Sequence, residues 1–265
     1  MTGPQSAERP SIICDLDGVV YRGNVALPGA ADALERLDRS GFRTLFVTNN
    51  SSRTESQVAD KLEALVGHRP DPENVVTSAR AAVALVPDGR TKCLVVGGDG
   101  IREALESADL EVVADDSAVD CVVVGLDRQF DYGVLDRAAR AIRDGALFIA
   151  TNVDPTFPAA HGRIMPGAGS MVAAIQSASG VDPVVAGKPH KPITDLIRSR
   201  DVNRAWVIGD RPDTDIAMAV NEPDWTSVLV LTGVTGAATD ARGADHVVEN
   251  LSAAVDLVIA YGDEQ

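Results

Sequence analysis

The residues best placed to do chemistry form a short acidic motif, Asp15-Leu16-Asp17-Gly18, directly after the apolar run Ser11–Cys14. An apolar run of this length that ends in a turn predicts a buried strand. Asp15 and Asp17 are two residues apart, so on a strand they share one face at a spacing of about 6–7 Å. Two such carboxylates repel each other unless a cation lies between them or one is protonated. The motif therefore predicts a hard-metal site or a nucleophile beside an acid or base; the alternative is a surface turn rich in Asp.

Polar groups also follow three further apolar runs that the sequence predicts to be strands. The motifs after them are Thr48-Asn49-Asn50, Gly187-Lys188-Pro189 and Gly209 through Asp215. Such runs alternate with helical periodicity along the chain, which is typical of an α/β fold with a parallel sheet. Because the carboxyl ends of parallel strands meet at one edge, all four motifs can converge there. Each motif alone also fits an ordinary turn before a helix or a surface lysine.

The side chains of the four motifs complement one another chemically. Carboxylates suit a hard cation, hydroxyl and amide groups suit an anion's oxygens, and Lys188, one of four lysines in the chain, suits a charged transition state. Oxygen ligands without His or Cys favour Mg²⁺ over Zn²⁺. Gly18 lets the backbone turn sharply and lets a ligand come close. This combination fits phosphoryl transfer, in which the protein mainly positions groups and stabilises charge.

Composition limits the classes of partner. The 265 residues suffice for one large or two modest domains, and a net charge of −15 argues against binding to nucleic acid or to an anionic membrane. No apolar stretch reaches transmembrane length, and the first ten residues lack the apolar segment of a secretory signal. Cys14, Cys93 and Cys121 lie far apart in apolar runs, so we expect separate buried thiols in a reducing cytoplasm.

Between the motifs, three stretches carry expectations of their own. Ser52 and Glu55 have the spacing of a capping box and predict a helix to about Val66. From Lys92 the strand–helix pattern restarts, and its glycine loop, 97–100, lacks the spacing of a dinucleotide fingerprint or P-loop, which favours a plain turn. Residues 151–169 predict a long loop that could bind a substrate, with Asn152, Asp154, Phe157, His161 and Arg163.

The four motifs, in this order, resemble motifs I to IV of the haloacid dehalogenase (HAD) superfamily of phosphatases. Three further phrases look like subfamily IIA, the NagD and 4-nitrophenylphosphatase-like branch: Val124–Asp127, Ala150–Pro155 and Pro166–Ser170. The resemblance runs from Ile12 to about Leu257. One departure is the segment Asn221–Trp225, where relatives usually have a small turn rich in Ala and Gly.

The resemblance implies a Rossmann-like parallel-sheet core, residues 1–78 and 184–265, with an inserted α/β cap of the C2 type, residues 79–183. It implies a cytoplasmic, Mg²⁺-dependent phosphatase that hydrolyses small phosphorylated metabolites through an aspartyl-phosphate. It is also compatible with a homodimer. A receiver-like signalling module is half this length and has no cap, and a regulatory member with weak catalysis does not fit the intact acids.

Roles for individual residues also follow from the resemblance. Asp15 would be the nucleophile, Asp17 the acid and base, and Lys188 would offset the charge of Asp15. Mg²⁺ would be held by Asp15, the Asp17 backbone carbonyl and Asp210, with Asp215 supporting them. Thr48, Asn49 and Lys188 would hold phosphoryl oxygens. The full set expected to bind substrate or phosphate is Gly18, Thr48, Asn49, Asn50, Asn152, Asp154 and His161.

Two phrases of the predicted cap bear on the substrate. The cap phrases Asn152–Thr156 and Gly169–Ala174 look closest to actinobacterial glycerol-3-phosphate phosphatases, which makes glycerol 3-phosphate the leading substrate. Phosphoglycolate, pyridoxal phosphate, nucleotides and sugar phosphates are the alternatives within the branch. A phosphomutase that uses the same aspartyl-phosphate is the nearest enzymatic alternative.

Overall fold

A computed structural model describes residues 9–115, 118–158, 163–233, 235 and 243–262. The chain forms two compact units, the first of residues 1–47, 62–69 and 198–265 and the second of residues 48–61 and 70–197. Helices alternate with parallel strands in both units, which confirms the predicted α/β class. Among the described helices, none is long and apolar enough to cross a membrane. The division into a catalytic core and a cap stays a prediction.

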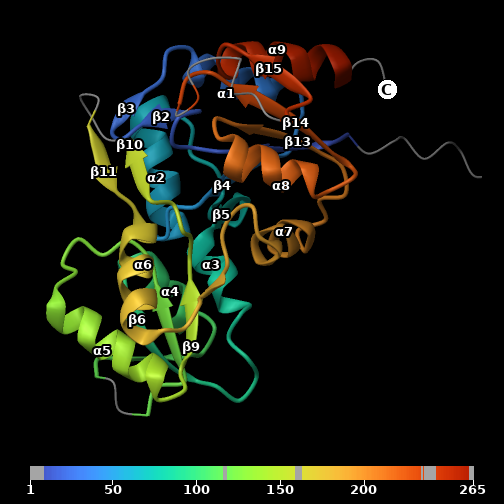
Figure 1. The fold of residues 1–265 in the computed structure, drawn as a ribbon. Coiled ribbons are helices and arrows are strands. Elements are labelled where there is room, and N and C mark those ends of the chain that lie inside the picture. The colour runs from blue at the N-terminus through green and yellow to red at the C-terminus, as the bar shows by residue number, and fades with distance from the viewer. Residues whose placement is uncertain (1–8, 116–117, 159–162, 234, 236–242, 263–265) are drawn as a thin grey trace, which may run out of the picture. The chain divides into compact units, whose positions relative to one another are not determined.

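In the first unit, parallel strands lie side by side in the order β15 (His246–Val248), β14 (Trp225–Val230), β13 (Ala205–Gly209), β1 (Ser11–Cys14) and β4 (Thr44–Thr48) (Figure 1). Strands β1 and β13 are buried throughout, as their apolar sequences predict. In the register, Cys14 lies opposite Ile208 of β13. The residues that follow these two strands therefore leave the sheet side by side, at its carboxyl edge.

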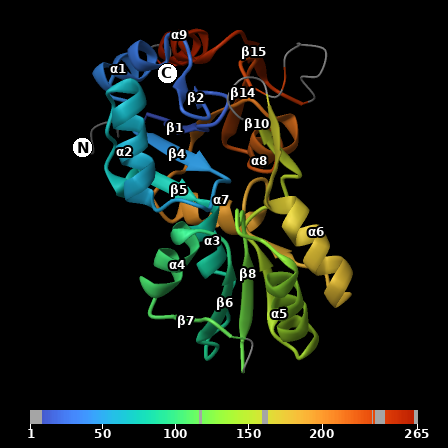
Figure 2. The same cartoon turned by 90° about the vertical axis from the view of Figure 1, so that its left-hand side faces the viewer.

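Helices cover both faces of this sheet. Helices α1 (Ala30–Arg39) and α9 (Leu251–Gly262) lie side by side on one face, and α8 (Ala217–Val220) lies on the other (Figures 1 and 2). The Arg36 side chain joins α1 to α9 through bonds to the Ser252 hydroxyl and the Asp256 carboxylate. Strands β2 (Tyr21–Arg22) and β3 (Val25–Ala26) form a small antiparallel pair.

The sequence after β13 predicts a helix that begins at Asp215 and a strand at Val228–Leu231, and both predictions are wrong at their boundaries. A π-helical turn covers Pro212–Ile216, so the regular helix begins at Ala217 and not at Asp215. Strand β14 begins at Trp225, three residues before the predicted start at Val228. Trp225 is 5% exposed, so the departing segment noted in the sequence ends in a buried strand.

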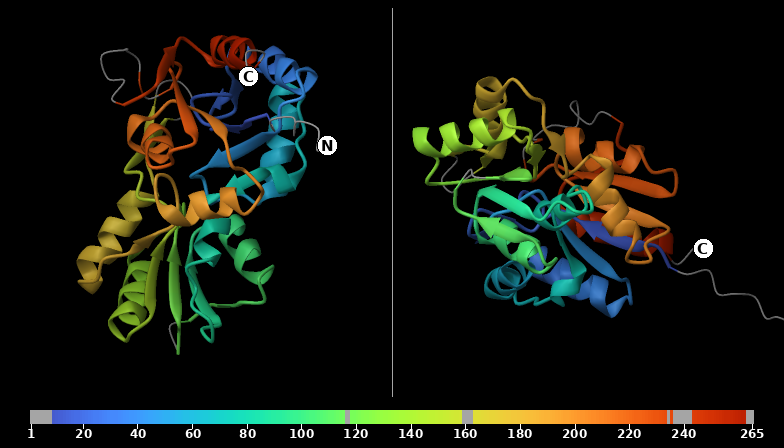
Figure 3. Two further views of the ribbon diagram at one scale, coloured as in Figure 1. Left: turned by 90° about the vertical axis from the view of Figure 1, so that its right-hand side faces the viewer. Right: turned by 90° about the horizontal axis from the view of Figure 1, so that it is seen from below.

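The second unit has its own parallel sheet, in the order β12 (Val184–Val185), β9 (Leu147–Ala150), β8 (Cys121–Val124), β6 (Lys92–Val96) and β7 (Glu111–Val113). Helices α5 (Tyr132–Arg143) and α6 (Ala168–Ser179) cover one face, and α4 (Asp99–Glu106) covers the other (Figures 2 and 3). A core that includes Val122, Phe148, Ile142 and Ile175 fills the space between the sheet and α5 and α6. The predicted restart of the strand–helix pattern at Lys92 is confirmed.

The remaining elements of the chain are α2 (Glu55–Val66), a 3₁₀ turn at Pro72–Asn74, β5 (Val75–Thr77), α3 (Ser78–Val83), β10 (Thr156–Pro158), β11 (Ile164–Pro166) and α7 (Lys191–Arg198). The predicted loop over residues 151–169 is partly wrong, because β10 and β11 pair there as an antiparallel hairpin. Cys93 and Cys121 are buried, as predicted, but they lie opposite each other in β6 and β8.

The predicted capping box of α2 is displaced by two residues. The Thr54 hydroxyl accepts a hydrogen bond from the Gln57 backbone N–H at 3.1 Å, and the Gln57 side chain accepts one from the Thr54 N–H at 3.2 Å. The Ser52 hydroxyl donates instead to the Asn50 side-chain oxygen at 2.7 Å. Asn50 thus holds Ser52 in a turn of its own, and the next hydroxyl caps the helix.

Asp245 ties the start of β15 to β14 and makes stability depend on pH. Its carboxylate accepts hydrogen bonds from the Ser227 N–H at 2.8 Å and the Ser227 hydroxyl at 2.7 Å. These bonds lower the pKa of Asp245 below its ordinary value of 3.8. A lowered pKa in the folded state means that the carboxylate stabilises the fold above that ordinary value, and that this contribution is lost as pH falls through the folded-state pKa.

We therefore predict that Asp245→Asn lowers the free energy of unfolding by about 1 kcal/mol at pH 7, a small value because the carboxylate is exposed. The difference from the unchanged protein shrinks below about pH 4. Urea denaturation at pH 7 and pH 3 measures both values, with Asp88→Asn, an exposed acid, as the control. An equal loss at the two pH values would contradict the linkage.

Candidate active site

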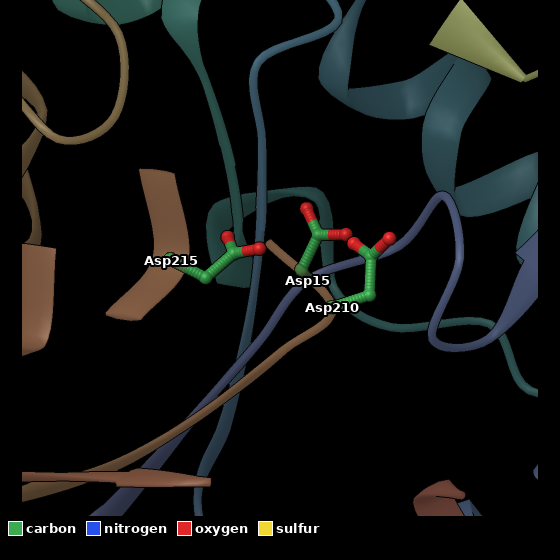
Figure 4. A group of neighbouring side chains, drawn as sticks. All are labelled: Asp15, Asp210 and Asp215. Atoms are coloured by element: carbon green, nitrogen blue, oxygen red, sulfur yellow. The ribbon is translucent and has the colours of Figure 1, made fainter. Parts of the chain in front are cut away.

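Three carboxylates meet at the carboxyl edge of the first unit's sheet. Asp15 follows β1, Asp210 follows β13, and Asp215 lies in the π-helical turn. One oxygen from each carboxylate lies within 4.8 Å of those from the others, and Figure 4 shows the three side chains gathered together. They are 8%, 1% and 1% exposed. The Asp15 N–H donates to the Ile208 carbonyl at 2.9 Å, which fixes the end of β1 beside β13.

This acidic group has the composition of a site for a hard divalent cation. Three buried carboxylates repel one another strongly, and a cation between them removes that repulsion. All of the donors are oxygens, which suits Mg²⁺. Asp17 is half-buried and pairs through its backbone with Tyr21, outside this group of three. Its predicted role through the backbone carbonyl stays a prediction.

Glycines surround the acidic group and leave room for its carboxylates. Gly18 has a φ of +99°, and a Cβ there would lie 2.6 Å from an Asp210 carboxylate oxygen. A Cβ at Gly233 would lie 1.8 Å from the same oxygen, and one at Gly209 would lie 2.2 Å from the Asp215 Cβ. Gly233 is not among the residues predicted from the sequence, although Thr232-Gly233 after the apolar run of β14 repeats the pattern of a strand that ends in a polar motif.

Asp213, a member of the same motif, is separate from the acidic group. Its carboxylate accepts two hydrogen bonds from the Arg211 guanidinium, at 3.1 and 2.7 Å. Burial by itself raises the pKa of Asp213, but the hydrogen bonds and charge of Arg211 outweigh it, and the pKa lies below its ordinary value. The motif therefore divides into two buried acids that face Asp15 and one that is paired with arginine.

The second unit gathers a different set of predicted residues around Asn49. The Asn49 side-chain amide donates to the Asp154 carboxylate at 3.1 Å and to the Lys188 carbonyl at 3.2 Å, and its oxygen accepts from the Lys188 N–H at 2.8 Å. The Asn49 carbonyl accepts from the Asn152 amide and from the Ser78 hydroxyl, both at 2.7 Å. The Asn49 side chain thus joins the segments that carry Asp154 and Lys188.

This network shows how the second unit holds Lys188. The lysine is 4% exposed, and a Cβ at the preceding Gly187 would lie 2.5 Å from the Asn49 side-chain oxygen, so the chain passes Asn49 at close range. Burial lowers the pKa of the neighbouring His190 below its ordinary value of 6.5, which disfavours the charged form of its side chain. Both polar atoms of the Asn49 side chain make hydrogen bonds to other residues of the protein, which favours a role in positioning those residues.

The other residues predicted to bind substrate or phosphate are Thr48, Asn50, Asn152 and His161. The Thr48 hydroxyl accepts a hydrogen bond from the Asn50 N–H at 3.1 Å, so these two residues share one turn. Asn152 is buried, and its side-chain oxygen accepts from the Asp154 N–H at 3.1 Å. His161 lies outside the described residues. That these residues bind substrate or phosphate stays a prediction.

The sequence matches models of known protein families. A model described as haloacid dehalogenase-like hydrolase matches residues 12–111, and one described as HAD-hydrolase-like matches residues 185–254. The chain belongs to the haloacid dehalogenase-like hydrolases. It is 42% identical to the D-glycerol 3-phosphate phosphatase of Mycobacterium tuberculosis over 87% of its own length, but it spans only 65% of that relative.

Solved structures of this family are similar over nearly the whole chain. The glycerol phosphate phosphatase of Mycobacterium tuberculosis in complex with magnesium superposes with a TM-score of 0.83 at 38% identity, covering 92% of this chain and 75% of that one. NagD from E. coli superposes with a TM-score of 0.80 at 29% identity, covering 92% and 97%. These matches confirm the predicted HAD fold and its NagD-like branch.

The glycines around the acidic group yield a test of metal binding. In this HAD-like hydrolase, Gly233→Ala places a methyl group where the Asp210 carboxylate lies, and the φ of Gly233 does not itself require glycine. We predict that the affinity for Mg²⁺ falls at least about tenfold, which corresponds to about 1.4 kcal/mol. Isothermal titration calorimetry measures the affinity, and a melting curve checks the fold.

The matched control is Gly133→Ala in α5, whose Cβ would meet only side-chain atoms, the nearest at 3.3 Å. It is expected to bind Mg²⁺ like the unchanged protein. If Gly233→Ala did so as well, the acidic group would not be the metal site.

Proposed function

We propose that this chain is a Mg²⁺-dependent phosphatase that hydrolyses small organic phosphate monoesters through an aspartyl-phosphate. The observation that carries the proposal is the buried group of Asp15, Asp210 and Asp215 at the carboxyl edge of a parallel sheet. A relative named as a phosphatase and a related phosphatase structure that contains magnesium support it. The net charge of −15 favours a small metabolite over nucleic acid as the substrate.

In this reaction Asp15 is the nucleophile and Asp17 the acid and base. A carboxylate oxygen of Asp15 attacks phosphorus, the bond to the leaving oxygen breaks, and Asp17 donates the proton that the leaving oxygen takes up. Asp17 then accepts a proton from the water that attacks the aspartyl-phosphate. Free phosphate leaves, and the Asp15 carboxylate is restored.

The metal ligands in this proposal are the carboxylates of Asp15 and Asp210 and the backbone carbonyl of Asp17, with Asp215 supporting them. Bound Mg²⁺ supplies positive charge that offsets the carboxylates and the phosphoryl oxygens. Gly18, Gly209 and Gly233 leave the space that these carboxylates need. The residues therefore fit the ion in number, chemical type and burial.

For the phosphoryl oxygens we propose Thr48 and Lys188 as ligands, with Asn49 holding Lys188 and Asp154 in position. The hydrogen bonds of Asn49 to both of these residues support the positioning role. We further propose that residues 1–78 and 184–265 act as the catalytic core and residues 79–183 as the cap that selects the leaving group.

Glycerol 3-phosphate is the substrate that we propose first, because the relative at 42% identity is named for it. The alternatives are phosphoglycolate, pyridoxal phosphate, a nucleotide or a sugar phosphate. A phosphomutase would use the same aspartyl-phosphate, but it would return an isomer of the substrate and no free phosphate. A screen of phosphorylated metabolites for phosphate release distinguishes all of these.

The nucleophile is tested by Asp15→Asn. Its amide cannot attack phosphorus, so we predict that release of phosphate from 4-nitrophenyl phosphate falls by at least about 10²-fold while the circular dichroism spectrum stays unchanged. Asp213→Asn is the matched control, since it removes a carboxylate of the neighbouring motif that is paired with Arg211. Activity of Asp15→Asn above about a hundredth of the unchanged rate would rule out the covalent mechanism.

Selection by the cap is tested on the β10–β11 hairpin, where Arg163 is exposed. If this side chain contacts only the leaving group, Arg163→Ala raises KM for glycerol 3-phosphate several-fold and changes kcat less. Turnover of 4-nitrophenyl phosphate is less affected. The control is Arg140→Ala on α5, another exposed arginine. Equal losses on both substrates, or none on either, would show that the hairpin does not select the substrate.

A further inference from the structure

A cavity of about 740 Å³ lies within the second unit. Three segments line it: the first half of α2 with the residues before it, the loop from β6 to α4 with the first half of α4, and the loop from β8 to α5. No residue of the proposed catalytic or phosphoryl-binding set contributes to its lining. Its volume is in the range of small-molecule sites. We name it the β6–β8 cavity, after the two strands whose ends it adjoins.

The topology of the second sheet makes this a favoured place for a ligand. From β6 the chain crosses to β7 on one side, whereas from β8 it continues to β9 and β12 on the other. The loops after β6 and β8 therefore diverge, α4 going to one face and α5 to the other (Figure 2). Open parallel sheets bind ligands at such a switch point, outside the carboxyl ends of the strands.

The glycine loop between β6 and α4 brings the segment before α2 to the cavity wall. A Cβ at Gly98 would lie 2.7 Å from the Ser52 carbonyl oxygen, and one at Gly100 would lie 2.2 Å from the Arg53 carbonyl oxygen. The backbone of residues 52 and 53 thus packs directly on the start of α4. This explains the glycines, which the sequence predicted only as a plain turn, and it gives the cavity a wall of closely packed backbone.

The charges around the cavity favour an anion. Arg53, Arg102 and Arg128 come from the three different segments, and in the part of the chain that the structure describes none of them takes part in an ion pair. Lys61 is a fourth basic residue of the lining. Guanidinium groups from separate segments can bind the oxygens of phosphate or carboxylate groups in pairs.

The other lining residues narrow the class of ligand further. The acids in the lining are Asp60, Asp99 and Asp127, and the Asp127 carboxylate accepts a hydrogen bond from the Gln129 N–H of its own loop at 2.8 Å. Leu126 is the one large apolar side chain in the lining, and no aromatic ring is present among these described residues. The lining therefore suits a small, highly polar anion better than a nucleoside, whose base would need an apolar or aromatic surface.

We propose that the β6–β8 cavity binds a small polyanion with two or more phosphate or carboxylate groups, held by Arg53, Arg102 and Arg128. All residues of this site belong to the second unit, so the proposal does not depend on the proposed phosphatase activity. Binding would weaken as salt increases, because the contacts are between charged groups.

The test is a chemical-shift titration of the full chain by NMR, without added metal, with pyrophosphate and citrate as the probes and glycerol as the neutral control. We expect saturable shifts of the backbone amides of residues 97–99 and 126–129. Shifts with pyrophosphate alone identify a phosphate site, shifts with citrate alone a carboxylate site, and shifts with both a general polyanion site. No saturable shifts at these amides with either probe would overturn the proposal.

Two triple variants with the same change of net charge separate site binding from general electrostatics. Replacement of Arg53, Arg102 and Arg128 by Gln is expected to weaken binding at least about tenfold, since each charge-assisted hydrogen bond contributes at about that scale. Replacement of Arg39, Arg69 and Arg140 by Gln, all exposed and ion-paired elsewhere, leaves binding within about twofold. Equal affinities of the two variants would overturn the assignment to the three arginines.

Discussion

The mutual repulsion of three buried carboxylates is the constraint on which the first unit's chemistry depends. Asp15, Asp210 and Asp215 would separate if the chain let them, but the pairing of β1 with β13 fixes the first two at neighbouring strand ends. The π-helical turn holds Asp215 close by. Such repulsion is relieved by a cation or by protonation. With three oxygen donors near one another, a divalent ion does so most completely.

The same constraint explains the glycines and the need for a lysine. A carboxylate group packed this closely leaves no volume for side chains at Gly18 and Gly233. A chain with a net charge of −15 also repels a phosphate monoester, so the proposed reaction needs positive charge close to the phosphoryl group. In the second unit, Lys188 is held by backbone hydrogen bonds to the Asn49 side chain. Because the N–H and the C=O of Lys188 are both held, the backbone of this residue has little freedom. This lowers the entropy cost of placing its long, flexible side chain.

The sequence predicted the features that depend on interactions between residues close together in the chain. Apolar runs that end in polar motifs predicted β1, β4 and β13 and the acids after them, because burial and strand ends are marked within a few residues. The cap of α2 was misplaced because two hydroxyls, Ser52 and Thr54, compete for it, and Asn50 decides the outcome by binding Ser52. The position of Cys93 opposite Cys121 was not predictable, since it depends on the register of strands far apart in sequence.

The glycine loop at 97–100 lacks the spacing of a known nucleotide-binding motif, yet it contributes to the lining of the β6–β8 cavity. Its spacing matches neither a dinucleotide fingerprint nor a P-loop, and Gly98 and Gly100 make room for the backbone of Ser52 and Arg53. By doing so they bring Arg53 into the lining that also contains Arg102 and Arg128. In a chain so acidic, arginines without ion-pair partners among the described residues are attracted to any anion that reaches them. Gly98 and Gly100 thus act indirectly: they let residues 52 and 53 pack against the start of α4, and Arg53 then lines the cavity.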